Sequence, residues 1–206
     1  MKVLEPNPTT LPGCSSTNTN SSQEATAKLY GIEDWGFDYF FINEDGNLAV
    51  APSKDRSRSI DLYRVVQELA TTQQATPTLL RFPQILDERM SALHEAFVSA
   101  IEEFRYENLH LAVYPLKVNQ RANVVGHLIK NGASYQYGLE VGSKAELAVA
   151  LAMPLPAGAL IVCNGLKDNL FLQAAVLSEK VGKRAIVVVE ESVDILAAVE
   201  VGRELN

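Results

Sequence analysis

The first clear pattern of hydrophobic and polar positions is a pair of short apolar runs at residues 38–42 and 47–51. The polar residues between the two runs centre on Asp45 and Gly46. An Asp-Gly pair between apolar runs is typical of a tight turn, because glycine adopts the left-handed backbone conformation that such turns need. The pattern therefore predicts an antiparallel β-hairpin.

A helical pattern follows Ser59 and stops before Pro77, with apolar residues three or four positions apart at Leu62, Val65, Val66 and Leu69. Together with the hairpin it forms a predicted N-terminal region at residues 29–76. The preceding segment is different, since residues 7–23 carry no charge and few apolar side chains. Such a segment buries too little apolar surface to offset the entropy of ordering. We therefore expect residues 1–28 to be a disordered polar tail.

Residues 77–206 show a repeating pattern. Helical patterns alternate with short apolar runs, whose starts are 31, 26, 24 and 26 residues apart, near Thr78, Leu109, Tyr135, Ala159 and Ala185. One of the helical patterns opens with Ser143 and Glu146 at the spacing of a capping box. Strands that alternate with helices at a near-constant spacing are typical of a parallel sheet. The predicted fold class is therefore α/β, with an N-terminal hairpin and helix followed by about five βα units.

The pattern alone leaves two arrangements open for these units. One is an open, doubly wound sheet of five strands, and the other is the first part of a (β/α)8 barrel of the TIM type. Because five units cannot close an eight-stranded barrel, the pattern by itself slightly favours the open sheet.

Composition and charge exclude several classes of function. Of the 206 residues, 47% are hydrophobic and 21% are charged, which is typical of a folded globular protein. The net charge of −7, without a basic cluster, argues against nucleic acid or an anionic membrane as a partner. The longest apolar stretch, residues 145–163, contains two prolines and is not a membrane span. Cys14 and Cys163 make neither a disulfide framework nor a zinc motif, and we expect a cytoplasmic protein without a secretory signal.

Polar residues end all five apolar runs, at Arg81, Lys117, Glu140, Asn164 and Glu190. In both arrangements the carboxyl ends of the strands meet at one edge, where α/β proteins place their active sites. For any single position the simpler interpretation is that a strand end meets water and is polar for that reason. Five such positions together favour a functional site.

Lys117 is the most distinctive of these residues, because it is the one cation in the apolar segment 111–119. Burial lowers the pKa of a lysine, and a neutral amine attacks an aldehyde to form a Schiff base. Glu140, at the end of the next run, could pair with this lysine or orient a cofactor. On the pattern alone, a lysine that extends its ammonium into water is the simpler interpretation. Pro115 cannot donate to a strand ladder, so we expect the strand to end or bend there.

Other signals for chemistry are weak. His94, His110 and His127 lack the spacing of metal ligands, so no metal site is predicted. No Gly-x-Gly-x-x-Gly follows a strand, and the sequence contains no phosphate-binding loop that ends in Gly-Lys-Ser/Thr. This argues against nicotinamide and nucleoside-triphosphate enzymes.

The segment 114–120 (Tyr-Pro-Leu-Lys-Val-Asn-Gln) resembles the pyridoxal-phosphate lysine segment of the biosynthetic arginine decarboxylases, within the alanine racemase and ornithine decarboxylase fold group. Further blocks resemble the same family in the same order and bring the covered range to about 30–206: residues 35–43, 59–62, 79–82, 137–147 and 163–168. The Trp-Gly block at Trp35 and the Asn-Gly-x-Lys-Asp block at Asn164 favour arginine decarboxylases over ornithine or diaminopimelate decarboxylases.

The resemblance implies the barrel rather than the open sheet, with residues 77–206 as a partial pyridoxal-phosphate-binding barrel. It implies that Lys117 is catalytic and carries pyridoxal 5'-phosphate as an internal aldimine, and that Glu140 and Asn164 belong to the cofactor site. The implied reaction is the decarboxylation of L-arginine to agmatine and carbon dioxide, in polyamine and spermidine biosynthesis. A magnesium ion and a homo-oligomer of the intact enzyme are implied by the family alone.

The sequence departs from the family in detail and in length. Arg121, Val141 and Leu166 replace residues typical of the family, and none of them removes the lysine. Family members are several times longer, with later strands, a glycine-rich phosphate loop and a β domain. We therefore expect an N-terminal fragment that is inactive alone. The alternatives are another pyridoxal-phosphate amino-acid decarboxylase of the same fold group, a barrel enzyme that uses Lys117 without this cofactor, and a non-catalytic (βα)5 binding module.

Overall fold

The structure is a computed structural model that describes residues 19–72 and 77–205. The chain divides after Arg81 into two compact units, which we describe separately. The predicted domain boundary, after residue 76, lies slightly before this division. Residues 1–18 of the predicted disordered tail lie outside the described residues.

The N-terminal unit contains a three-stranded antiparallel sheet. Strands β1 (Phe40–Ile42) and β2 (Leu48–Val50) form the predicted hairpin. Gly46 in its turn has a φ of +80°, a conformation that glycine adopts without steric cost. Strand β3 (Ile60–Asp61) pairs with β2 and was not predicted. A strand of two residues is too short to show an alternating pattern of apolar and polar side chains.

Helices surround this small sheet: α1 (Thr19–Leu29), α2 (Ile32–Gly36), the 3-10 helix η1 (Arg56–Arg58) and α3 (Leu62–Thr71). Helix α3 confirms the helix predicted after Ser59. The prediction of a disordered tail is wrong for residues 19–28, which lie in α1. The side-chain amide of Gln23 donates hydrogen bonds to the carbonyls of Asn43 and Glu44, at 3.0 and 3.1 Å. Polar contacts with the hairpin turn therefore hold a helix whose sequence contains few apolar residues to bury.

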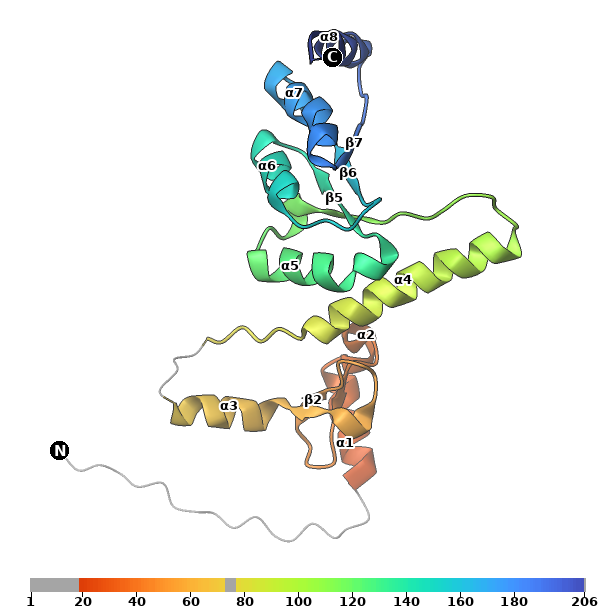
Figure 1. Ribbon diagram of the computed structural model, residues 1–206. Coiled ribbons are helices and arrows are strands. Elements are labelled where there is room, and N and C mark those ends of the chain that lie inside the picture. Colours follow the sequence, from red (N-terminus) through yellow and green to blue (C-terminus); the bar gives the residue numbers. More distant parts are fainter. Residues whose placement is uncertain (1–18, 73–76, 206) are drawn as a thin grey trace, which may run out of the picture. The chain divides into compact units, whose positions relative to one another are not determined.

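The C-terminal unit is an α/β structure (Figure 1). Its parallel sheet has four strands in the order β4-β5-β6-β7. The strands are β4 (Val113–Pro115), β5 (Gly138–Val141), β6 (Leu160–Cys163) and β7 (Arg184–Val187). The helices are α4 (Pro83–Glu103), α5 (Ala122–Asn131), α6 (Lys144–Ala152), α7 (Asn169–Leu177) and α8 (Ser192–Leu205). Short 3-10 helices complete it: η2 (Leu116–Val118), η3 (Ala133–Tyr135) and η4 (Ser178–Val181). Strand β4 ends at Pro115, as predicted.

The prediction of five strand–helix units is wrong by one strand. The apolar run at 78–82 belongs to neither sheet, and α4 begins directly after it at Pro83. An apolar run forms a strand only where a neighbouring strand pairs with its backbone and its side chains are covered. Leu79, in this run, is exposed and no strand pairs with the run, so this condition is not met.

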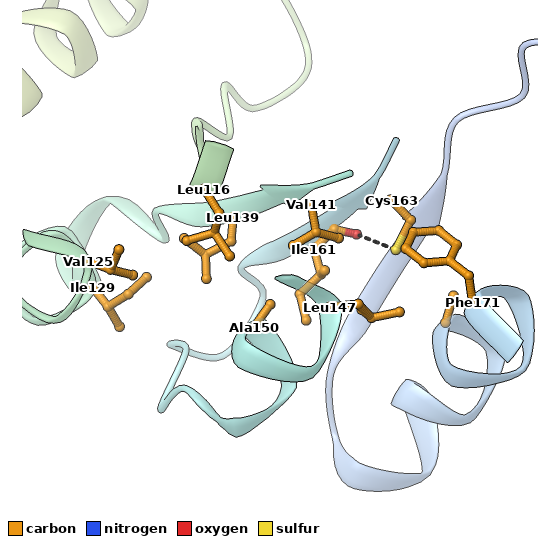
Figure 2. Packing of buried hydrophobic residues seen from close by; sticks show 11 residues of the cluster. Leu116, Val125, Ile129, Leu139, Val141, Leu147, Ala150, Ile161, Cys163 and Phe171 are labelled. Atoms are coloured by element: carbon orange, nitrogen blue, oxygen red, sulfur yellow. Dashed lines mark hydrogen bonds between the residues drawn. The ribbon is translucent and has the colours of Figure 1, made fainter. Parts of the chain in front are cut away.

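The core of this unit lies between the sheet and its helices (Figure 2). Alternate strand residues point to this side, where Leu139, Val141, Ile161 and Cys163 of the strands and Phe171 of α7 have no exposed surface. Leu147 and Ala150 of α6 and Ala175 of α7 complete the contact with these two helices. Hydrophobic burial on this one face therefore holds the strands in register.

The intervening strand residues point to the opposite face of the sheet, because side chains alternate along a strand. The register places Pro115, Glu140, Val162 and Ile186 in one row across the four strands. Glu140 is the one charged residue of this row. It is therefore oriented away from the helix-covered core and towards the other face.

Candidate functional site

The carboxyl ends of β4–β7 meet at one edge of the sheet, because all four strands are parallel. Three of the polar residues predicted to end strands lie at or close to strand ends: Lys117 two residues after β4, Glu140 one residue before the end of β5, and Asn164 directly after β6. Glu190 lies in the segment between β7 and α8. Arg81 does not belong to this group, because it precedes α4 in a segment without a strand.

Lys117 and Glu140 lie together at this edge. The Lys117 Nζ atom is 4.0 Å from Glu140 Oε1, and the two side chains are 66% and 11% exposed respectively. The parallel register explains the pairing, since Pro115 lies opposite Glu140 and the chain carries Lys117 two residues further. The predicted proximity of this lysine and this carboxylate is therefore present in the structure.

The surroundings of Lys117 differ from the prediction. The apolar neighbours along the chain suggested a desolvated amine, whereas most of the Lys117 side chain is exposed. Leu116 is buried in the core while Val118 is exposed, so η2 turns Lys117 away from the apolar cluster. The amine is thus accessible to a molecule that approaches the edge of the sheet.

Glu140 is the buried member of the pair. Its Oε2 atom is buried and has no hydrogen-bond partner among the described residues. An unsatisfied buried carboxylate oxygen is costly, and a donor on a bound molecule would remove that cost. Glu140 therefore offers a hydrogen-bond acceptor next to the Lys117 amine.

Asn164 lies at the end of the adjacent strand. Its backbone N–H donates to the Val141 carbonyl at 2.8 Å, and its side-chain oxygen accepts a hydrogen bond from the Gly165 N–H at 2.9 Å. The structure thus places Asn164 at the same edge as the Lys117–Glu140 pair and connects it to the backbone of β5. Both of these hydrogen bonds are with backbone groups rather than with either side chain of the pair.

One charged residue at this edge was not a candidate in the sequence. Lys167, four residues after β6, has a side chain that is only 2% exposed and lies between Glu190 and Asp194. The sequence contains one signal for Lys167, namely that it lies in the short segment directly after the predicted strand that ends at Cys163. Its acidic partners come from the next loop, so no local pattern indicates its burial.

The histidines have structural surroundings. The His127 Nε2 atom is 2.8 Å from Asp87 Oδ1, which connects α5 to α4. The His110 ring stacks on Phe97, and burial lowers the pKa of His110. Within residues 19–72 and 77–205, no three His, Cys, Asp or Glu side chains form a group that could hold a metal ion. The magnesium ion implied by the resemblance stays a prediction.

The unit is therefore a parallel α/β domain with an accessible lysine at the carboxyl edge of its sheet. Sequence comparison agrees with this class: residues 89–202 match the pyridoxal-binding domain of the pyridoxal-dependent decarboxylases, and the chain belongs to this family.

Within the family, the chain is similar to biosynthetic arginine decarboxylases. It is 38% identical to the enzyme of Prochlorococcus marinus (strain MIT 9215) over 187 residues, which cover 91% of this chain and 29% of the relative. It is 39% identical to that of Thermosynechococcus vestitus over 188 residues, 91% of this chain and 30% of the relative. The crystal structure of the Campylobacter jejuni enzyme superposes with a TM-score of 0.77 at 34% identity, over 85% of this chain and 29% of that one.

The chain therefore spans about three tenths of the length of the curated relatives it matches. Among the described helices, none combines the length and the apolar character needed to cross a membrane.

Proposed function

We propose that this chain supplies the pyridoxal-phosphate-binding part of an arginine decarboxylase, which converts L-arginine to agmatine and carbon dioxide. The observation that carries the proposal is the Lys117–Glu140 pair at the carboxyl edge of a parallel sheet, within a segment of the pyridoxal-binding family. Similarity to three arginine decarboxylases supports arginine as the substrate.

The residues at this edge fit pyridoxal 5'-phosphate in their chemistry. An aldehyde needs an accessible amine, which Lys117 provides. A bound group with hydrogen-bond donors needs an acceptor, which the buried Oε2 atom of Glu140 provides. Lys117 and Glu140 would hold the cofactor together with Asn164, whose position at the end of β6 borders the same edge.

When bound, the cofactor supplies an electron sink for the electron pair that remains as carbon dioxide leaves. The part of this chain is to present the Lys117 amine to the aldehyde of the cofactor. Glu140 lies close enough to the Lys117 Nζ atom, at 4.0 Å, to stabilise its proton or to accept it after a small movement. Glu140 thus acts on the protonation of the amine, while Lys117 makes the covalent contact.

We also propose that β4–β7 form part of a (β/α)8 barrel. The strand order follows the sequence order without reversal, whereas a doubly wound sheet reverses its order at a switch point. Both α6 and α7 pack on the same face of the sheet, as barrel helices do. These features favour the barrel over the open sheet. A homo-oligomer of the intact enzyme and a cytoplasmic location remain part of the proposal.

The cofactor arm of the test uses the 206-residue chain. Incubation with pyridoxal 5'-phosphate and reduction with borohydride should attach a pyridoxyl group to Lys117, which peptide mass spectrometry would locate. The Lys117→Arg variant keeps the charge and should lose this adduct. An adduct mainly on Lys144 or Lys167 in the unaltered chain would contradict the assignment.

The substrate arm uses a chimera in which this chain replaces the matching part of the Campylobacter enzyme. We expect the chimera to release agmatine from arginine, and to lose this activity with Lys117→Arg. The family match covers pyridoxal-dependent decarboxylases in general, so a second candidate is another amino-acid decarboxylase of the same fold group. A chimera that decarboxylates ornithine but not arginine would favour this candidate.

A further inference from the structure

Lys167 is a buried cation outside the Lys117–Glu140 pair. Its side chain is 2% exposed, and its Nζ atom lies 3.4 Å from Glu190 Oε1 and 3.6 Å from Asp194 Oδ2. Burying an ammonium is costly unless opposite charges replace the lost water. The two carboxylates supply opposite charge at ion-pair distance, although the Lys167 Nζ atom has no hydrogen-bond partner among the described residues. We call these three residues the Lys167 bridge.

The bridge connects two loops at the carboxyl edge of the sheet. Lys167 belongs to the loop between β6 and α7, whereas Glu190 and Asp194 belong to the loop after β7 and to α8. Asp194 also accepts hydrogen bonds from the backbone N–H groups of Glu190 and Glu191, at 3.0 and 3.2 Å. It therefore fixes the start of α8 and the Lys167 ammonium at the same time.

The first loop also presses against the strand that carries Glu140. Gly165 has a φ of +75°, and a Cβ atom at this position would lie 2.5 Å from the Gly142 carbonyl oxygen. Asn164 donates its N–H to the Val141 carbonyl at 2.8 Å. A loop held this tightly against β5 determines where the backbone beside Glu140 lies. The bridge restrains this loop from its other end.

We propose that Lys167 is a positioning residue, whose bridge to Glu190 and Asp194 fixes the Asn164–Gly165 turn against β5 and so holds the cofactor edge in its binding geometry. This inference rests on the proposed function, because the geometry that it maintains is that of the Lys117–Glu140 site. Lys167 itself is enclosed and carries two counter-ions, so it does not compete with Lys117 for an aldehyde. The two lysines have different tasks at one edge.

The experiment compares Lys167→Met with Lys144→Met in the 206-residue chain. Lys144 is a matched control, because its ammonium also pairs with an acidic residue at this edge, Asp168, but its side chain is 54% exposed. Hydrogen exchange measured by mass spectrometry follows the peptide that contains Asn164 and Gly165, with a peptide of α5 as reference. Titration with pyridoxal 5'-phosphate, followed by absorbance, gives the affinity of the cofactor.

We expect Lys167→Met to accelerate exchange of the Asn164–Gly165 peptide about tenfold and to weaken pyridoxal-phosphate affinity about tenfold, since removing one partner leaves buried charge uncompensated. The α5 peptide should keep its exchange rate, and Lys144→Met should change neither quantity by more than about twofold. The double variant Lys167→Met/Asp194→Asn also removes the charge of Asp194, the more buried of the two carboxylates. It should recover thermal stability but retain the fast exchange of the turn.

Equal acceleration in both peptides, or failure of both Lys167 variants to fold, would assign Lys167 to global stability and overturn the positioning role. Unchanged exchange of the Asn164–Gly165 peptide would overturn it as well. If the unaltered chain forms no adduct at Lys117, the proposed function fails, while the exchange comparison still decides whether the bridge holds the turn.

Discussion

Asp61 connects three parts of the N-terminal unit through its carboxylate. The Oδ2 atom accepts hydrogen bonds from the side-chain amides of Asn43 and Asn47 at 2.8 and 2.9 Å, and Oδ1 accepts one from the Arg64 N–H at 3.1 Å. The hydrogen bond from Asn47, followed by those from Arg64 and Asn43, lowers the pKa of Asp61 to about 2 against the opposing effect of burial. The carboxylate thus holds both the hairpin turn and the first turn of α3.

This lowered pKa predicts a loss of stability in acid. The folded-state pKa of Asp61 lies below its unfolded value of 3.8, so its contribution is complete above about pH 4 and is lost as the pH falls towards 2. Trp35 is the one tryptophan of the chain and lies in this unit, so its fluorescence reports the unfolding. We expect Asp61→Asn to reduce the pH dependence between 4 and 2, and exposed Asp45→Asn to leave it unchanged. If the unaltered chain, Asp61→Asn and Asp45→Asn all lost stability equally between pH 4 and pH 2, the prediction would be contradicted.

Glu140 lends itself to a conservative substitution, because glutamine keeps the shape of the side chain and removes its charge. We expect Glu140→Gln to fold normally and to slow adduct formation with pyridoxal 5'-phosphate at Lys117 by about fivefold, because the amide cannot accept the proton that the Lys117 amine must lose before it attacks the aldehyde. Adduct formation is followed by absorbance after mixing with pyridoxal 5'-phosphate. Glu179→Gln, in η4, serves as the control. An unchanged rate in Glu140→Gln would remove Glu140 from the proposed site.

The proximity of Lys117 and Glu140 could be predicted because the ends of consecutive parallel strands adjoin, and the apolar runs located both strands. The exposure of Lys117 could not, since a run of apolar neighbours does not show which side chains the following turn buries. Lys167 differs from Lys117 in that its side chain is buried, and the sequence did not predict this burial. Its burial depends on Glu190 and Asp194, which a different loop contributes, so residues far apart in sequence decide it.

At the scale of elements, the hairpin and the main helices follow from patterns that the chain repeats over several residues. The helix predicted to open at Ser143 begins there, since the Ser143 hydroxyl accepts a hydrogen bond from the Glu146 N–H at 3.2 Å. The errors lie where tertiary contacts override the pattern. Helix α1 forms in a polar segment through contacts with the hairpin turn, and the run at 78–82 remains without a strand.

The capping of α6 gives a prediction at this scale. Glu146 Oε2 accepts a hydrogen bond from the Gly142 N–H at 2.7 Å, so Ser143 and Glu146 together satisfy backbone donors at the start of the helix. We expect Ser143→Ala to lower the free energy of unfolding by about 1 kcal/mol, and Ser143→Asp to retain the cap. Denaturant unfolding followed by circular dichroism measures both. An equal loss in the aspartate variant would show that the hydroxyl acts through something other than the cap.

At the scale of the whole molecule, the sheet and its last helix leave apolar surface uncovered. Ile186, in the row that contains Glu140, is 41% exposed, and α8 exposes Ile195, Leu196 and Val199. Covering apolar surface contributes about 25 cal/mol for each Å², so association that covers these residues is favoured. The relatives are more than three times as long as the matched region.

We therefore expect the 206-residue chain to form oligomers and to be inactive by itself, although Lys117 is accessible. A cofactor held only by Lys117, Glu140 and Asn164 lacks most of the contacts that exclude water, so it should dissociate readily. Sedimentation velocity measures the oligomers, and an assay for agmatine with added arginine and pyridoxal 5'-phosphate measures activity. The chimera described above is the positive control for this assay. A monomeric chain that unfolds cooperatively and decarboxylates arginine would contradict the prediction, since it would show that four strands and their helices suffice for both folding and catalysis.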